Sequence, residues 1–299
     1  MLNIMRYYKF WFVVSGIILI AGIVSLILFG LKLGIDFKGG TLSELKFEKS
    51  TPAIADIQSV LKANGFNDAQ VQPGSQTVII RTGPQEKVDH DRLVKALSDK
   101  FGAVTEVQYT SIGPVIGKEL RSQAFVQLFL VSLGIVLYIG YAFRKVTKPV
   151  SSWRFGIAAI VALLHDLFVV IGIFSILGHF KGIEVDSLFV TALLTVLGFS
   201  VHDTIVVFDR IRENLRVRAG QNLSEIINNS INQTLVRSLN TSLTVIFVLL
   251  SLFLFGGESI HNFVLALLVG IIAGTYSSIF IASPLLIVWH NWDLRKRAV

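Results

Sequence analysis

Long apolar segments, separated by shorter charged ones, dominate the pattern of this chain. A transmembrane helix needs about 20 mostly apolar residues to cross a hydrocarbon core of about 30 Å. Six segments meet that requirement: Phe10–Leu31, Ala124–Phe143, Phe155–Phe180, Val185–Phe208, Leu239–Phe255 and Ile260–Trp289. The first has a longer apolar run than a signal peptide and no small-x-small cleavage site, which favours an uncleaved anchor. The pattern therefore predicts an α-helical integral membrane protein with six transmembrane helices.

The segment between the first two spans, residues 32–121, has a soluble-like pattern with 12 basic and 11 acidic residues. Its apolar periodicity predicts four strands, Thr41–Glu48, Ala69–Gln72, Thr77–Arg81 and Val104–Thr110. It also predicts two helices, one capped by Thr51 with Pro52 in its first position and ended by Gly65, and one at Lys87–Phe101 with a stripe of Val88, Leu93, Val94 and Leu97. The order β-α-β-β-α-β predicts a ferredoxin-like α+β domain between transmembrane helices 1 and 2.

Basic residues fall on alternate sides of the predicted spans. They occur at the N-terminus, in the connections after spans two and four, before span five, and at the C-terminus: Arg6, Lys9, Arg144, Lys145, Lys148, Arg154, Arg210, Arg212, Arg216, Arg218, Arg237, Arg295, Lys296 and Arg297. By the positive-inside rule both termini are cytoplasmic and the α+β domain is exported. The predicted organisation is residues 1–31 (N-terminus and helix 1), 32–121 (exported, periplasmic or extracellular domain), 122–292 (helices 2–6) and 293–299 (basic cytoplasmic tail). A short basic-faced helix is expected along the lipid surface near Ile211–Gly220.

Composition changes the picture mainly by exclusion. Apolar residues make up 53% of the chain and charged residues 16%, so a water-soluble enzyme is not expected. The basic residues behind the net charge of +7 lie at the predicted inner membrane face, next to the lipid bilayer. Nucleic acid is therefore not an expected partner. The chain has no cysteine, which excludes disulfides and thiolate metal sites. Gly39-Gly40 lacks the Gly-Lys-Ser/Thr of a phosphate loop, so no nucleotide is predicted. No cofactor and no metal are predicted from the sequence either.

Candidate chemistry lies in the few ionisable residues inside the spans. A charged side chain at mid-membrane costs about 2.5–3.5 kcal/mol on insertion scales, so such residues are functional candidates. They are Asp166 beside His165 in span three, Asp203 beside His202 in span four, and Arg237 at the start of span five. Span six adds a polar cluster, Thr275, Tyr276, Ser277 and Ser278, and span five adds Asn240, Thr241, Ser242 and Thr244.

A carboxylate in a low-dielectric site favours a bound proton, whereas a nearby arginine favours the charged form. If the distance between Asp203 and Arg237 changes with conformation, proton binding and shape become coupled. Structural alternatives remain open: an Asp203–Arg237 ion pair that only fixes packing, hydrogen bonds of Asp166 between helices, and histidines that only pack. Gly270-x-x-x-Gly274 is expected to permit close helix packing.

Several segments carry a resemblance to a known family. They are Gly34–Thr41 after the first span, Ser111–Leu120 before the second, Ala162–Asp166, Gly198–Asn214, Thr234–Ser238, Thr241-Ser242 and Gly274–Ser278. In this order they resemble the SecF side of the SecD/SecF family of protein-export membrane proteins, which is related to the resistance–nodulation–division exporters. Three positions depart from the family pattern: His202 stands where Asn is usual, Phe199 where Tyr is usual, and Lys38 where a small hydroxyl residue is more frequent.

The resemblance implies a subunit of the bacterial inner membrane, not an enzyme, that acts with SecD and the SecYEG channel, together with an accessory YajC-like protein. Such a pair uses the proton-motive force to promote translocation and release of preproteins. The family's intramembrane Asp and Arg match Asp203 and Arg237, and Asp166 is a weaker match. His202 adds a titratable group beside this site, and the hydroxyls of Thr275–Ser278 complete an expected polar relay.

Two rival functions remain open at this point. One is half of a small-molecule or lipid exporter, because five spans after one exported domain are half of such a transporter. The other is a structural scaffold of the translocation channel that moves no protons. The coupling ion is open as well, since carboxylate and hydroxyl groups can serve a proton or sodium.

Overall fold

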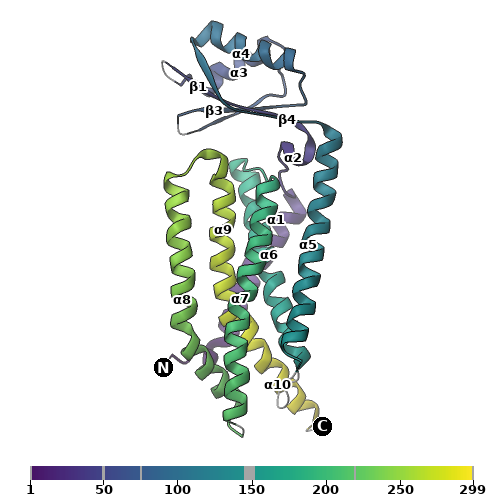
Figure 1. Cartoon of the computed structure of the whole chain (residues 1–299), viewed down its shortest axis with the longest axis vertical. Helices are drawn as coiled ribbons and strands as arrows, with labels where there is room; N and C mark the ends of the chain where they lie inside the picture. Colours follow the sequence, from purple (N-terminus) through teal and green to yellow (C-terminus); the bar gives the residue numbers. More distant parts are fainter. Residues whose placement is uncertain (1, 49–50, 75, 145–151, 219, 298–299) are drawn as a thin grey trace. The chain divides into compact units, whose positions relative to one another are not determined.

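The computed structural model describes residues 2–48, 51–74, 76–144, 152–218 and 220–297, which form two compact units (Figure 1). The helical unit comprises Met1–Lys32, Gln127–Ile183 and Leu188–Val299, and the α+β unit comprises Leu33–Val126 and Glu184–Ser187. Six helices are long and apolar enough to cross a membrane. The predicted fold class is confirmed: six spans, with a small α+β domain between the first and the second.

The helices continue beyond the predicted apolar segments. A short 3₁₀ turn, η1 (Ile4–Tyr7), leads into α1 (Tyr8–Phe29), and the later spans are α5 (Pro114–Ala142), α6 (Ser152–Lys181), α7 (Ser187–Val217) and α8 (Leu223–Phe255). The last span consists of α9 (Glu258–Ser277), a π-helical segment η2 (Ser278–Ala282) and α10 (Ser283–Arg297). Residues 211–217 prolong α7, and Ile211 and Leu215 are buried, so the separate surface helix expected there is not formed. The basic residues Lys145 and Lys148 lie outside the described residues.

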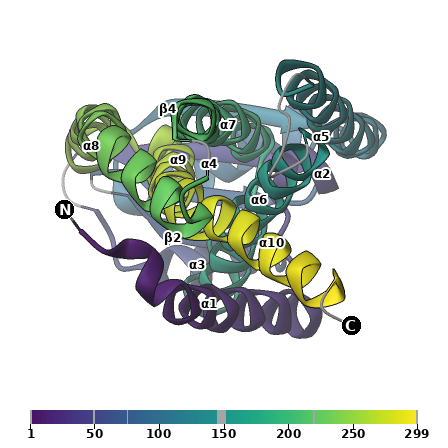
Figure 2. The same cartoon turned by 90° about the horizontal axis from the view of Figure 1, so that it is seen from below.

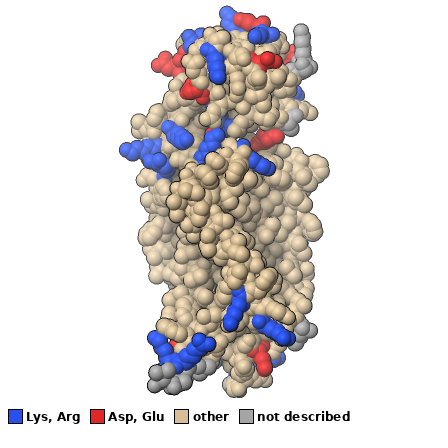
Figure 3. All heavy atoms as spheres, turned by 180° about the vertical axis from the view of Figure 1, so that it is seen from behind, with Lys and Arg blue, Asp and Glu red and all other residues tan. Residues whose placement is uncertain are grey.

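Burial separates central helices from peripheral ones in the helical unit. In the last span, about 72% of an 18-residue apolar stretch is buried. The corresponding share is 56% in α6 and in α7, and only 6% in α5. In the end-on view, α9 lies among α6, α7 and α8, and α5 lies at the edge (Figure 2). On the face shown in Figure 3, the middle of the helices carries no charged side chain, as a membrane-spanning surface requires.

Glycines allow two close helix contacts in this unit. A Cβ on Gly22 of α1 would lie 3.0 Å from Gly172 Cα of α6, so the two backbones touch. A Cβ on Gly270 of α9 would lie 2.1 Å from Val196 Cγ2 of α7, and one on Gly274 would lie 3.0 Å from Ser200 Cβ. The close packing predicted for Gly270-x-x-x-Gly274 is therefore present, between α9 and α7.

The π-helical segment of the last span has a local cause that the sequence contains. Pro284 has no N–H, and in a regular α-helix its ring would clash with the carbonyl four residues earlier. The wider turn over Ser278–Ala282 accommodates it. The Ser283 hydroxyl donates to the Ser278 carbonyl at 2.9 Å, which satisfies one of the backbone acceptors released there.

The α+β unit contains the predicted order of elements. After the short α2 (Ile35–Lys38), the elements are β1 (Gly40–Phe47), α3 (Ile54–Ala63), β2 (Gln70–Pro73), β3 (Val78–Thr82), α4 (Lys87–Phe101) and β4 (Val104–Ile112). The strands form an antiparallel sheet in the order β2-β3-β1-β4. Helices α3 and α4 pack on it through a core that includes Leu45, Ile57, Ile80, Leu93 and Leu97.

Two predicted details of these helices are wrong. Helix α3 begins two residues after Pro52, with Ala53 at its N-cap, because the amides of Asp56 and Ile57 bond to the Ala53 carbonyl. In α4, Val88 is exposed and His90 is buried in its place, because the stripe runs through positions 90, 93 and 97.

A β-bulge explains how the buried His90 is accommodated. Glu44 pairs with Gln108 and Leu45 with Glu106, so Val107 is the extra residue of β4. The bulge turns Glu106 and Tyr109 to the same face of the strand, although they are three positions apart. His90 Nε2 lies 2.9 Å from Glu106 Oε1, and its ring lies 4.2 Å from that of Tyr109.

Two of the family-like segments meet at one junction in the α+β unit. Gly39 and Gly40 both have positive φ, of 79° and 148°, which favours glycine. A Cβ on Gly39 would lie 2.8 Å from Pro114 Cα, and one on Gly117 would lie 2.8 Å from Gly39 N. The start of β1 therefore packs directly against the start of α5, and side chains at these positions would separate them.

The segment between α6 and α7 also belongs to the α+β unit. Asp36 accepts hydrogen bonds from both the amide and the hydroxyl of Ser187, and Arg81 Nε lies 3.2 Å from Glu184 Oε2. The amide of Gly34 donates to the Val185 carbonyl at 2.8 Å. The sequence pattern did not predict that these residues join the domain.

Candidate functional site

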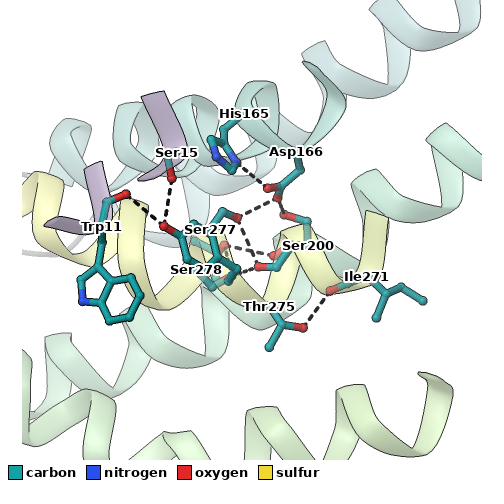
Figure 4. Close-up of polar contacts among 12 residues, drawn as sticks. Trp11, Ser15, His165, Asp166, Ser200, Ile271, Thr275, Ser277 and Ser278 are labelled. Carbon is teal, nitrogen blue, oxygen red and sulfur yellow. Dashed lines mark hydrogen bonds and ion pairs between the residues drawn. The ribbon is translucent and has the colours of Figure 1, made fainter. Parts of the chain in front are cut away.

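Four consecutive residues of the last span contact four different helices. Successive residues of a helix are turned by about 100°, so a run of four polar residues presents polar atoms all around the axis. The contacts are Thr275 Oγ1 with Ser242 Oγ of α8 (2.6 Å), Tyr276 Oη with the Trp11 carbonyl of α1 (3.0 Å), Ser277 Oγ with Asp166 Oδ2 of α6 (2.8 Å) and Ser278 Oγ with Thr204 Oγ1 of α7 (2.8 Å). The predicted relay residues therefore lie at the centre of the helical unit (Figure 4).

Asp166 is fully buried and has its hydrogen bonds completed by protein groups. Its Oδ1 lies 3.0 Å from His165 Nδ1. Its Oδ2 accepts from the hydroxyls of Ser200 at 2.5 Å and Ser277 at 2.8 Å. Three hydrogen-bond donors around one carboxyl group are the arrangement that stabilises a carboxylate away from water.

The His165 ring stacks on that of Tyr276, with the ring centroids 6.2 Å apart. Its Nδ1 is committed to Asp166, whereas its Nε2 is buried and has no hydrogen-bond partner among the described residues. Tyr276 also accepts from the Ser15 hydroxyl at 3.1 Å, which extends the cluster to α1.

Asp203, one turn after Ser200 on α7, is nearly buried, with 7% of its surface exposed. The hydroxyls of Ser238 and Ser278 face its carboxyl group. Asp203 Oδ2 and Ser238 Oγ are both buried without a hydrogen-bond partner in the part of the chain that the structure describes. Most buried polar groups find a partner, so the two atoms without one distinguish the surroundings of Asp203 from those of Asp166.

Hydroxyl groups connect the surroundings of the two aspartates. Thr204 Oγ1 lies 2.8 Å from Ser278 Oγ and also bonds to the Ser200 carbonyl at 3.0 Å. Ser277 and Ser278 are adjacent, and they contact α6 and α7 respectively. The hydroxyls that contact Asp166 and those that face Asp203 thus lie next to one another on α7 and on the last span.

Arg237 does not lie against Asp203 in this conformation. It is exposed and, among the described residues, has neither an ion pair nor a hydrogen bond. It lines a cleft of about 450 Å³ between α7 and α8, whose other lining residues are Ile205, Val206, Asp209, Arg210, Glu213, Gln233 and Thr234. The structural Asp203–Arg237 ion pair considered from the sequence is therefore not formed here.

His202 lies next to Asp203 in sequence, but its side chain is exposed. In α8, Asn240, Thr241 and Thr244 are likewise exposed, and Ser242 alone of that group points inward. Of the predicted site residues, the structure brings Asp166, Asp203 and the Thr275–Ser278 cluster together, and it places Arg237 and His202 outside.

The residues that sequence reasoning missed are small hydroxyls: Ser200, Thr204 and Ser238. A signal for part of this set was available. Ser230, Thr234, Ser238 and Ser242 recur at every fourth position of α8, and all four are buried. Such spacing places them on one helix face. No group of three or more His, Asp or Glu residues that could hold a metal is found among the described residues.

Comparisons with known proteins show the family of the chain. The family profile "Protein export membrane protein SecD/SecF, C-terminal" matches residues 93–292, and "SecD/SecF GG Motif" matches residues 24–51. The "Protein translocase subunit SecF" of Thermobaculum terrenum is 50% identical, over 99% of this chain and 96% of that protein. That of Anaerolinea thermophila is 42% identical, again over 99% of this chain and 96% of that protein.

Among solved structures, SecDF of Thermus thermophilus, described as a translocon-associated membrane protein, is 34% identical with a TM-score of 0.85. The match covers 97% of this chain and 39% of SecDF, so the chain spans about two fifths of that longer protein. A second SecDF structure, in a super-membrane-facing form, is 31% identical with a TM-score of 0.72, over 99% of this chain and 40% of that one. The chain belongs to the SecD/SecF family of protein-export membrane proteins and aligns over nearly its whole length with relatives named as SecF subunits.

Proposed function

We propose that this chain is the SecF subunit of a bacterial Sec export machinery. A separate SecD subunit supplies the rest of the longer SecDF arrangement, and the pair acts at the SecYEG channel on translocating preproteins, with a YajC-like accessory protein. The chain lies in the cytoplasmic membrane with both termini inside and the α+β unit outside. Support comes from the relatives named as protein translocase subunits and from the positions of Lys and Arg in the sequence.

The pair is proposed to be driven by an ion gradient, with Asp203 as the proton acceptor. The observation that carries this proposal is the pair of unpartnered buried atoms, Asp203 Oδ2 and Ser238 Oγ. The Ser238 hydroxyl can donate to Asp203 when the carboxyl group is charged and can accept from it when the carboxyl group carries a proton, so the site suits both protonation states. A proton that crosses 100 mV supplies about 2.3 kcal/mol, which is enough to shift a conformational equilibrium substantially.

Arg237 has a role in the deprotonated state under this proposal. An unpaired carboxylate inside a span is costly, so the present conformation, with Arg237 in the cleft, fits a protonated Asp203. Loss of the proton then favours a conformation in which Arg237 reaches Asp203 and pairs with it. Asp166 and the hydroxyls of α7 and α9 connect this site to the rest of the cluster.

The proposal is tested by Asp203→Asn, which keeps the shape of the side chain but cannot bind and release a proton. Preprotein export is measured in membrane vesicles that contain the variant and its partners, with a proton or a sodium gradient imposed in turn. We expect gradient-stimulated export to disappear while assembly with SecD persists. The gradient that stimulates the unsubstituted protein identifies the ion.

Glu225→Gln is the matched control, because Glu225 is an exposed carboxylate in the first turn of α8. It should leave stimulated export unchanged. Normal stimulated export by the Asp203→Asn variant would instead favour a scaffold function, with Asp203 contributing to packing alone.

A further inference from the structure

The protons around Asp166 can be assigned by counting donors and acceptors. Ser200 and Ser277 each have one hydroxyl hydrogen, and both hydroxyls lie within bonding distance of Asp166 Oδ2. The remaining oxygen, Oδ1, lies 3.0 Å from His165 Nδ1, so one hydrogen must lie between these two atoms. Without it, two lone pairs would face each other in a buried site.

The shared hydrogen fixes where the pair can gain a further proton. In the form with net charge −1, Asp166 is a carboxylate, Nδ1 carries the shared hydrogen and Nε2 is bare. Addition of one proton makes the pair neutral. Whether the shared hydrogen then lies nearer to Nδ1 or to Oδ1, Nε2 is the atom that can take the added proton without loss of an existing bond. A proton on Oδ2 would require the Ser277 hydroxyl to turn from Asp166 at 2.8 Å to the Gly274 carbonyl at 3.2 Å.

His165 Nε2 is the atom that the structure leaves available. It is buried and has no partner among the described residues, and 5% of the His165 side chain is exposed. The titratable groups that face it are Asp166 on its own helix and Tyr276 on α9. Helices α1 and α7 contribute the uncharged Ser15 and Ser200 to the same cluster.

We propose that His165 Nε2 is a second proton-binding atom of this subunit, and that Asp166 acts as its positioning partner. A proton taken from water adds to Nε2 and converts the His165–Asp166 pair from a net charge of −1 to neutral, and its release restores the negative pair. This proposal deepens the ion-coupled function above. It places an exchangeable proton on the histidine, and the Asp166 carboxyl group keeps its three hydrogen-bond donors in both forms.

The test follows the protonation of the histidine nitrogens directly. The full chain, assembled with SecD in lipid nanodiscs, is labelled with ¹⁵N-histidine and studied by NMR as the pH is lowered. We expect His165 to show a protonated, hydrogen-bonded Nδ1 and a bare Nε2 at high pH, and to lose the bare-nitrogen signal on acidification. His165→Gln identifies these signals by removing them. His179→Gln, at the exposed end of the same helix, should leave them in place.

A second sample keeps the assignment secure if His165→Gln fails to fold. In it, the other five of the six histidines are replaced by Gln and His165 alone remains. The proposal is overturned if Nε2 stays bare at every pH while an infrared band of a protonated carboxyl group, absent from Asp166→Asn, rises on acidification. A bare Nδ1 would overturn it as well.

The NMR result does not depend on export. If His165 titrates at Nε2 but the unsubstituted protein shows no gradient-stimulated export, the proposed function fails and the proton site remains. If both hold, His165→Gln should lose most of the stimulated export, and His179→Gln should retain it. Export unaffected by His165→Gln would overturn the coupling role of this proton.

Discussion

Two buried aspartates on adjacent spans have opposite hydrogen-bonding situations. Asp166 receives three hydrogen bonds, whereas Asp203 has a buried oxygen with no partner among the described residues. The same side chain therefore serves two purposes within one cluster. At Asp166 the surrounding donors hold the carboxyl group in place, whereas Asp203 has no such set of donors and is the residue proposed above to exchange a proton.

Ser277→Ala tests the contribution of one donor to Asp166. The change leaves Asp166 Oδ2 with the Ser200 hydroxyl alone. We expect the free energy of unfolding to fall by about 1 kcal/mol. A hydrogen bond between membrane helices contributes on average about 0.6 kcal/mol, and a buried acceptor that loses one of its donors adds a further cost. Thermal unfolding in nanodiscs measures it. Ser251→Ala, at an exposed position of α8, is the control, and an equal effect of both changes would contradict the prediction.

The sequence predicts the charged members of the cluster better than its neutral members. Asp166 and Asp203 are recognisable because a carboxyl group in an apolar span is costly. Serine and threonine occur throughout apolar helices at little cost, so Ser200 could not be separated from exposed residues such as Thr241. Ser238 could have been recognised only through its four-residue spacing from Thr234 and Ser242. The position of Arg237 could not be predicted either, because a long side chain at the edge of an apolar segment can turn toward the protein or toward water.

At the level of helices, small residues determine how closely the spans approach. Gly270 and Gly274 bring α9 against α7, where Ser200 and Thr204 then reach the polar residues of α9 and α6. The hydroxyls at every fourth position of α8 face the last span from another side, where Ser242 contacts Thr275. Close backbone packing and the polar cluster are thus consequences of the same helix faces.

Gly270→Ala should destabilise the contact between α9 and α7. The new methyl group would overlap Val196 Cγ2, and overpacking of this kind costs about 1–3 kcal/mol. Thermal unfolding of the full chain in nanodiscs measures the loss. Gly198→Ala is the matched control, because nothing lies within 4 Å of a Cβ there, and the higher helix propensity of alanine should keep stability equal or raise it by up to about 1 kcal/mol.

A second substitution distinguishes overlap from other causes. Val196→Ala removes both atoms that the new methyl group would meet most closely, so the double variant should be more stable than the sum of the two single effects implies. Purely additive effects would show that the clash is relieved elsewhere.

Elements were predictable from periodicity, and their ends were not. All six spans and the β-α-β-β-α-β order follow from runs of apolar residues. Helices α7 and α8 continue past the apolar stretch because polar residues are as compatible with a helix as apolar ones once outside lipid. The exposed Val88 and the buried His90 show a different limit, since the stripe through Leu93 and Leu97 reaches position 90, where a polar residue gives no apolar signal.

In the whole molecule, neither of the two units is one continuous stretch of the sequence. Leu33–Val126 is joined in the α+β unit by Glu184–Ser187, which follows α6. The chain therefore passes between the units at four places. Sequence patterns identify a domain as a continuous stretch, so this short returning segment, which bonds to Asp36 and Arg81, could not be assigned to it in advance.

The proposed orientation can be tested because the natural chain has no cysteine. Lys95→Cys places a thiol on an exposed position of α4, and Arg216→Cys places one on an exposed position near the end of α7. In intact cells, with the outer membrane permeabilised where one is present, an impermeant maleimide should label the first variant alone. Disruption of the cytoplasmic membrane should make the second reactive. The reverse pattern would show that the orientation inferred from Lys and Arg is wrong, and the cysteine-free protein gives the background.

The run Thr275–Ser278, in which each residue contacts a different helix, also limits how this protein can change in length. One residue inserted ahead of Thr275 would turn the run by about 100° relative to the preceding part of α9. Each hydroxyl would then point toward the helix that the adjacent residue of the run now contacts. Deletions would have the same effect in the opposite sense. Substitutions can alter one contact at a time, but an insertion or deletion inside α9 would break all four at once, so tolerated differences in length belong to the connections between helices.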